Sequence, residues 1–116
     1  PSGQIVDGLT DMQVPLDADR NYTIVVSRKE DRPSNATLAN GIAWMEWSPR
    51  GEGVDGPKNR ADFGMLMLRI MANNPSWTQS PAKVTQPGME EAVMGPYLPK
   101  GEYTTRAAFE ASGLQK

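Results

Sequence analysis

The sequence predicts a mainly β domain, a β-sandwich or jelly-roll-like fold with a short helix near residue 75 and a C-terminal helix. Two segments, residues 21–27 and 41–47, alternate their side chains with the two-residue period of a strand. A third segment, residues 63–72, is apolar on both faces except at Arg69, which is typical of a central strand. Eleven glycines and ten prolines among 116 residues predict many turns.

Length and composition exclude several classes of protein. A chain of 116 residues corresponds to a single domain or to the C-terminal part of a larger one. Apolar residues make up 38 %, below the ~45–50 % of an average globular domain, so the expected core is small. The net charge of −2 argues against nucleic-acid binding. Because Cys and His are absent, thiol catalysis, disulfides and His-ligated metal sites are excluded, and we expect no metal and no cofactor.

The N-terminal region, residues 1–19, is expected to be an irregular arm that leads through a polar turn at residues 16–21 into the first strand. Asp17 and Asp19 in this turn favour turn geometry over a calcium site, because the further oxygen ligands that calcium needs are missing. Within the arm, six apolar residues are expected to build one or two short strands: Ile5, Val6, Leu9, Met12, Val14 and Leu16.

The middle of the chain alternates loops and strands. Residues 28–40 form a charged loop, and the strand at residues 41–47 follows it. Residues 48–62 are rich in glycine, but they lack the Gly-Lys-Ser/Thr sequence of a phosphate-binding loop. Such a long connection is either functional or disordered. We expect residues 50–60 to be mobile or to become ordered against a partner.

The segment at residues 63–72 also has a helical interpretation, because Met and Leu favour helices. The strand is preferred because Asp62-Phe63-Gly64 supplies no good helix cap. After it, Asn74 as the cap and Pro75 as the first helical residue predict a short helical turn that runs to about Gln79.

The C-terminal region contains the clearest helix signal, at residues 104–112. Thr104 or Thr105 is the expected cap, the alanines favour the helix, and Gly113 ends it. Turns are expected before this helix, at Pro87-Gly88 and at Lys100-Gly101.

Two charged residues interrupt otherwise apolar strands, Glu46 and Arg69. An isolated buried charge is costly, so each side chain is expected to have a partner, and each is the first choice for the other. The pair has two interpretations, a structural ion pair or a binding site in which Arg69 holds an acidic ligand. Aromatic side chains either fill the core or line a ligand pocket. The candidate ligand-binding residues are therefore Arg69, Glu46, Trp44, Trp47, Trp77 and Tyr97.

Several strings in the sequence resemble, when taken together, the C-terminal part of uncharacterised, exported bacterial proteins. More loosely, they are similar to the C-terminal β domain of the family called domain of unknown function 1214. None of these strings is a catalytic signature, so the resemblance implies no functional residues. It covers most of residues 15–112 and rests on these strings: residues 15–19, 22–27, 31–36, 41–44, 68–71 and 93–101.

The function expected from these observations is that of a non-catalytic structural or ligand-binding module of a larger exported or periplasmic bacterial protein. The absence of the commonest general base and the best nucleophile favours this interpretation. The alternative is a segment of an enzyme, such as a carbohydrate hydrolase, whose catalytic groups lie mainly on another chain. Its carboxylate candidates are Glu90, Glu91 and Glu102.

The expected partner is another polypeptide or a second copy of the chain, with no nucleic acid and no membrane span. The longest apolar stretch, Phe63 to Leu68, is far too short to cross a bilayer. The sequence begins at Pro1, which predicts a processed product or a fragment. A catalytic N-terminal proline is the competing interpretation, but the loop-like Ser2-Gly3-Gln4 that follows argues against it.

Overall fold

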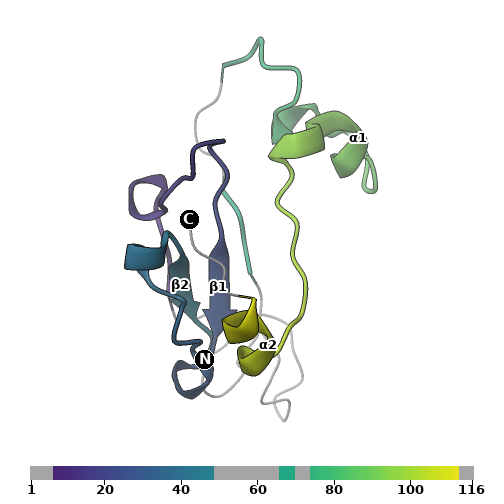
Figure 1. The fold of residues 1–116 in the computed structure, drawn as a ribbon. Coiled ribbons are helices and arrows are strands. Elements are labelled where there is room, and N and C mark those ends of the chain that lie inside the picture. Colours follow the sequence, from purple (N-terminus) through teal and green to yellow (C-terminus); the bar gives the residue numbers. More distant parts are fainter. Residues whose placement is uncertain (1–6, 49–65, 70–73, 113–116) are drawn as a thin grey trace. The chain divides into compact units, whose positions relative to one another are not determined.

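The computed structural model describes residues 7–48, 66–69 and 74–112. The chain divides into two compact units (Figure 1). The sheet unit comprises Pro1–Met65 and Thr104–Lys116, and the helical unit comprises Leu66–Tyr103. Each unit is described on its own below.

The sheet unit is built on two parallel strands, β1 (Ile24–Ser27) and β2 (Ala43–Glu46) (Figure 1). Ile24 pairs with Ala43 at one end of the register, and Ser27 pairs with Glu46 at the other. The two strands lie within the segments predicted as strands. Their parallel direction requires a crossover, because a short hairpin turn joins only antiparallel strands.

The crossover, residues 28–42, contains two 3₁₀ turns, η2 (Lys29–Asp31) and η3 (Leu38–Asn40). The Thr37 hydroxyl accepts a hydrogen bond from the Asn40 N–H at 3.3 Å, which caps η3 at its start. Gly41 ends η3 with a φ of 74°, a left-handed conformation that glycine adopts without steric cost. The crossover then enters β2 through Ile42, which is fully buried.

The N-terminal arm, residues 7–16, contains one 3₁₀ turn, η1 (Asp11–Gln13). The Gln13 side chain accepts a hydrogen bond from the Thr10 N–H at 2.9 Å, so it folds back on the turn. The short strands predicted in the arm are absent from its described part, because these local bonds satisfy the backbone in place of a sheet ladder. Ile5 and Val6 lie outside the described residues.

The polar turn that follows the arm is confirmed. Asp17 Oδ1 accepts hydrogen bonds from the N–H groups of Asp19 and Asn21, both at 2.9 Å. An aspartate that closes a turn in this way has its carboxylate occupied by the backbone. The turn interpretation of the Asp17 and Asp19 pair therefore agrees with the geometry.

The C-terminal helix is also confirmed, as α2 (Arg106–Ala111). Thr105 is its cap, because the Thr105 hydroxyl accepts a hydrogen bond from the Ala108 N–H at 3.1 Å. The carboxamide of Asn35 in the crossover donates to the carbonyl of Phe109 at 3.2 Å, which anchors α2 to the sheet unit. The predicted stop, Gly113, lies outside the described residues.

The helical unit consists of short turns around a small core. Its elements are η4 (Pro81–Lys83), α1 (Glu90–Met94) and η5 (Gly95–Tyr97). Met94 and Ser80 are buried, with 4 % and 1 % of their surface exposed. The predicted turn at Pro87-Gly88 is present, whereas Lys100 and Gly101 form no turn.

The short helix predicted near residue 75 is absent, and a single turn takes its place. Asn74 Oδ1 accepts hydrogen bonds from the N–H and the hydroxyl of Ser76, at 3.0 and 2.8 Å. The Trp77 N–H closes the turn on the Asn74 carbonyl at 2.9 Å. Asn74 thus caps a turn as predicted, but the chain does not continue as a helix, because one turn is too short to offset the cost of nucleation.

The predicted β-sandwich or jelly roll is wrong. The described residues contain one sheet of two strands and no second sheet to pack against it. Of the predicted central strand, residues 66–69 have no strand structure, and Leu66, Met67 and Leu68 are 62, 69 and 59 % exposed. The remaining residues of that segment, and residues 49–62 of the glycine-rich connection, lie outside the described residues.

No helix in the described ranges is long and apolar enough to cross a membrane.

Candidate functional site

The sheet unit contains a groove of about 490 Å³ between the N-terminal arm and the start of β2. One side is formed by arm residues and the other by the crossover and β2. We call it the apolar groove, because most of its lining side chains are apolar. Its lining residues are Leu9, Met12, Gln13, Val14, Pro15, Arg32, Leu38, Ile42, Ala43 and Trp44.

The apolar groove has a buried base and an exposed rim. Ile42 and Ala43 are buried, with 0 and 1 % of their surface exposed, and they belong to the core of the sheet unit. Met12 and Leu38, by contrast, are 91 and 67 % exposed. Met12 comes from η1 and Leu38 from η3, so the rim is built from both sides of the groove. Large apolar side chains held in water around a groove are typical of an interaction surface.

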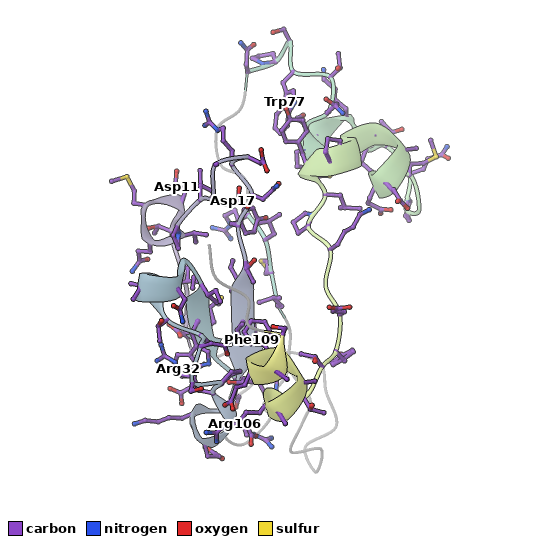
Figure 2. All side chains as sticks on the ribbon, in the orientation of Figure 1. Asp11, Asp17, Arg32, Trp77, Arg106 and Phe109 are labelled. Carbon is purple, nitrogen blue, oxygen red and sulfur yellow. The ribbon has the colours of Figure 1, made fainter. Side chains whose placement is uncertain are left out.

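One lining residue carries a charge, Arg32, which lies in the crossover of the sheet unit (Figure 2). Three contacts fix its position. Its guanidinium lies over the ring of Trp44, at 4.5 Å from the ring centroid, within the range of a cation–π interaction. Its Nε and Nη2 donate hydrogen bonds to the Ala36 carbonyl, at 3.1 and 2.8 Å. Arg32 has no carboxylate partner among the described residues, and it is the one charged residue among them that lines the groove.

Trp44 is held in turn from the neighbouring strand. Its indole N–H donates to the Ser27 hydroxyl at 2.8 Å, and that hydroxyl donates to the Arg28 carbonyl at 2.9 Å. The Arg32–Trp44 pair is therefore supported on both sides by hydrogen bonds. Side chains fixed in this way lose little conformational entropy when a ligand binds.

The outer edge of β2 is partly covered. The Ile42 N–H donates to the Thr37 carbonyl at 3.0 Å, and the Glu46 N–H donates to Asp7 Oδ2 at 2.9 Å. Trp44 lies between them, and its backbone N–H makes no hydrogen bond to a described residue. Among the described residues, this strand edge therefore has one backbone donor without a partner beside the groove.

The outer edge of β1 has two backbone N–H groups without a partner among the described residues. Thr23 and Ser27 accept hydrogen bonds from the β2 side, so the alternation along a strand turns the backbone groups of Ile24 and Val26 away from β2. Neither outward N–H is bonded to a described residue. A two-stranded sheet is only marginally stable by itself.

The predicted ligand-binding residues do not form one site. Trp44 lines the apolar groove, whereas Trp47 and Glu46 do not. Trp77 and Tyr97 meet in the helical unit with their ring centroids 5.1 Å apart at an interplanar angle of 88°, an edge-to-face contact. Their pairing is as well explained by packing in that unit as by a ligand pocket.

Glu46 and Arg69 belong to different units. Glu46 is half-buried at the end of β2, and Arg69 is exposed in a segment without strand structure. The two side chains would meet if residues 41–47 and 63–72 formed neighbouring strands, but residues 66–69 have no strand structure. Contact between the two side chains remains a prediction.

Sequence reasoning missed Arg32 and the rim residues Met12 and Leu38. Arg32 stands in a segment predicted as a charged loop, and its contact with Trp44 depends on how the crossover folds. Leu38 lies in the same predicted loop, and Met12 lies in a segment predicted as a strand. One sequence signal points to the groove, the cluster of apolar residues in the arm. The arm contains more apolar residues than a loop surrounded by water requires.

Two of the carboxylates proposed for an enzyme, Glu90 and Glu91, are not arranged as a catalytic pair. Glu90 and Glu91 are consecutive residues of α1, and consecutive residues on a helix do not face one another. Glu90 accepts a hydrogen bond from the Gly88 N–H at 3.2 Å, and Glu91 forms an exposed ion pair with Lys100 at 3.8 Å. Among the residues that the structure describes, no group of three acidic side chains could hold a metal ion.

One carboxyl group in the sheet unit has a shifted pKa. The hydrogen bond from the Arg106 side chain, followed by that from the Ser34 N–H, lowers the pKa of Glu110 below its usual 4.5. Both bonds end on Oε1, at 2.9 and 3.0 Å. Because these contacts join α2 to the crossover and lie outside the groove lining, they point to a structural role.

The comparisons with known proteins found no similar protein. No protein-family model matches the chain, no curated protein matches it, and no solved structure matches it. The groove must therefore be interpreted from its own geometry.

Proposed function

We propose that the chain is a non-catalytic binding module whose apolar groove receives an extended, apolar stretch of another polypeptide. The observation that carries the proposal is the exposed rim, with Met12 and Leu38 on opposite sides of a groove that has Ile42 at its base. Fully burying a side chain of this size contributes about 1.5–3 kcal/mol. The two rim residues together therefore offer a substantial driving force for association.

A polypeptide suits this groove better than a small molecule does. The rim is exposed on both sides, whereas a small-molecule site buries most of its ligand in a concave pocket. The backbone N–H of Trp44, which has no partner among the described residues, also lies beside the groove, where the backbone of an extended peptide can accept a hydrogen bond from it. The small core supports the same conclusion, since the chain has apolar surface left over for a partner.

Selection from a displayed library of random dodecapeptides tests the proposal. Binding of the enriched peptides is then followed by NMR through the indole N–H signals of Trp44, Trp47 and Trp77. We expect the Trp44 signal to shift, while Trp77 in the helical unit serves as an internal reference. The enriched peptides should be rich in apolar residues.

Rim variants make the test specific. Met12→Ser and Leu38→Ser should each weaken the binding of an enriched peptide about tenfold, since each removes roughly 1.5 kcal/mol or more of apolar burial. Met89→Ser is the matched control, because Met89 is an exposed methionine of the helical unit. The proposal is overturned if no enriched peptide shifts the Trp44 signal, or if the rim variants bind as well as the unchanged chain.

Export from a bacterial cell and membership of a larger protein remain predictions from the sequence. The N-terminal sequencing and intact mass of the protein isolated from its source would test them. A carbohydrate-hydrolase segment is the less favoured function, since two of its candidate glutamates, Glu90 and Glu91, are engaged in local contacts.

A further inference from the structure

We propose that the apolar groove recognises an acidic side chain within the apolar stretch that it binds, and that Arg32 is the residue that pairs with it. This inference rests on the proposed function, because it specifies the chemistry of the partner at the same site. It identifies the partner as a peptide with apolar residues around one Asp or Glu.

The first argument is the hydrogen-bonding capacity of Arg32. A guanidinium group has five N–H donors in a fixed planar arrangement. The hydrogen bonds from Nε and Nη2 to the Ala36 carbonyl engage two of them. Nη1 makes no hydrogen bond to a described residue, so its two donors and the second N–H of Nη2 remain for a ligand. Adjacent donors of this kind match the two oxygens of a carboxylate.

The second argument is charge complementarity. Arg32 is the single charged residue among the described residues that line the groove. No described Asp or Glu lines the groove with it, and no described carboxylate forms an ion pair with it. The nearest acidic residue along the chain is Asp31 in η2, which is exposed and does not line the groove. A carboxylate in the bound peptide would supply the missing opposite charge.

The third argument is that the guanidinium is already in place. The Ala36 carbonyl holds one edge of Arg32, and the ring of Trp44 supports one face at 4.5 Å. Trp44 is itself fixed by the Ser27 hydroxyl. A free arginine side chain would lose rotamer entropy on pairing, and this one loses less because its orientation is set before the ligand arrives.

The test uses the peptides selected above, in matched pairs. Each peptide is acetylated and amidated, so that its one acidic side chain is its sole carboxylate, and its partner has Gln or Asn at that position. With the unchanged chain, we expect the acidic peptide to bind about tenfold or more tightly than its amide partner, the effect of a hydrogen bond to a charged group. The difference should shrink as salt is added.

Variants of Arg32 assign the preference. With Arg32→Met, which keeps an apolar stem over Trp44, the two peptides should bind equally. With Arg32→Lys, which keeps the charge but not the planar donors, part of the preference should remain. The Trp44 indole signal and the protection of the Ala43 N–H from hydrogen exchange show whether each variant is folded.

The outcomes separate the two proposals. If apolar peptides bind at the groove but acidic and amide peptides bind alike, the role of Arg32 is wrong and the proposed function stands. If an acidic preference survives Arg32→Met in a folded variant, the carboxylate pairs elsewhere and the inference is likewise overturned. If no peptide shifts the Trp44 signal, both proposals fail.

Discussion

Glu110 joins α2 to the crossover through a single oxygen atom. Its Oε1 accepts one hydrogen bond from the Arg106 side chain and another from the Ser34 N–H. Arg106 also donates to the Glu30 carbonyl at 3.2 Å, and the Asn35 carboxamide donates to the Phe109 carbonyl, so three hydrogen bonds join helix and crossover. Arg106 and Phe109 both belong to α2 (Figure 2). Both contacts are stronger with the ionised carboxylate, because a charged acceptor forms stronger hydrogen bonds than a neutral one.

The stability of the sheet unit should therefore fall in acid. Because the pKa of Glu110 is lower in the folded chain than in the unfolded chain, its contribution is fully present above the unfolded value of about 4.5. It is lost as the pH falls through the lower, folded value. Replacing Glu110 by Gln should reduce stability at neutral pH, and the deficit should shrink below about pH 4.5. Urea unfolding midpoints measured from pH 7 to pH 3 test this.

The matched control for Glu110→Gln is Glu91→Gln, which removes a negative charge from an exposed ion pair. It corrects for the general effect of net charge on the unfolding midpoint. After this correction, the loss of stability in Glu110→Gln should depend on pH. If it stayed constant across the pH range, the carboxylate charge would not be what stabilises the contact.

At the scale of residues, caps were predictable and long-range contacts were not. Asp17, Asn74 and Thr105 bond to backbone groups within four residues, so the sequence around each contains the information. The Arg32–Trp44 contact joins residues separated by most of the crossover, and Glu110 meets a residue 76 positions earlier in the chain. Neither contact leaves a local pattern in the sequence.

The helix α2 depends on its cap and its anchors more than on its length. A helix of six residues is far below the ~12–15 residues at which an isolated helix becomes stable in water. The Thr105 hydroxyl satisfies the Ala108 N–H, one of the N-terminal donors without a partner inside the helix. The Asn35 carboxamide binds the Phe109 carbonyl near its other end.

Substitutions at Thr104 and Thr105 test which of the two threonines caps α2, a choice that the sequence left open. Thr105→Ala should cost about 1 kcal/mol of unfolding free energy, and Thr105→Ser should cost much less because serine caps as well. Thr104→Ala is the control, since Thr104 makes no hydrogen bond to a described residue. Hydrogen exchange at the Ala108 N–H should rise in Thr105→Ala alone; an equal rise in Thr104→Ala would contradict the assignment of the cap.

At the scale of elements, the sequence located β1, β2 and α2 but not how the strands pair. The alternation of side chains marks a strand and says nothing of its neighbour. A sandwich needs antiparallel neighbours and a second sheet, whereas residues 28–42 are long enough to cross over and make β1 and β2 parallel. α1 was missed because Glu90–Met94 makes a helix of barely more than one turn, between Pro87 and Pro96.

At the scale of the whole molecule, each unit has its own small core. Among the described residues, the buried apolar side chains of the sheet unit are Ala36, Ile42 and Ala43, and that of the helical unit is Met94. The predicted sandwich of two packed sheets would instead have given one continuous core. The composition showed that apolar residues are few. It did not show that they form two separate cores, because this depends on which segments contact one another.

Two core substitutions test whether the units unfold separately. Met94→Ala should cost roughly 2–5 kcal/mol within the helical unit, the usual range for truncating a buried methionine. Hydrogen exchange should then accelerate at the Val93 and Leu98 N–H groups, which bond to the Met89 and Gly95 carbonyls. The Ala43 and Trp47 N–H groups, which bond across the sheet, should keep their protection.

Ile42→Ala should give the reciprocal result, with loss of protection at Ala43 and Trp47 and none at Val93. Its side chain is fully buried, so a cost of roughly 2–5 kcal/mol is again expected. Tyr103→Ala is the control for substitution at a fully exposed position. If Met94→Ala and Ile42→Ala each accelerated exchange in both units equally, the chain would unfold as one cooperative body. A docked peptide should then protect the helical unit too, whereas separate units confine that protection to the groove and the sheet that supports it.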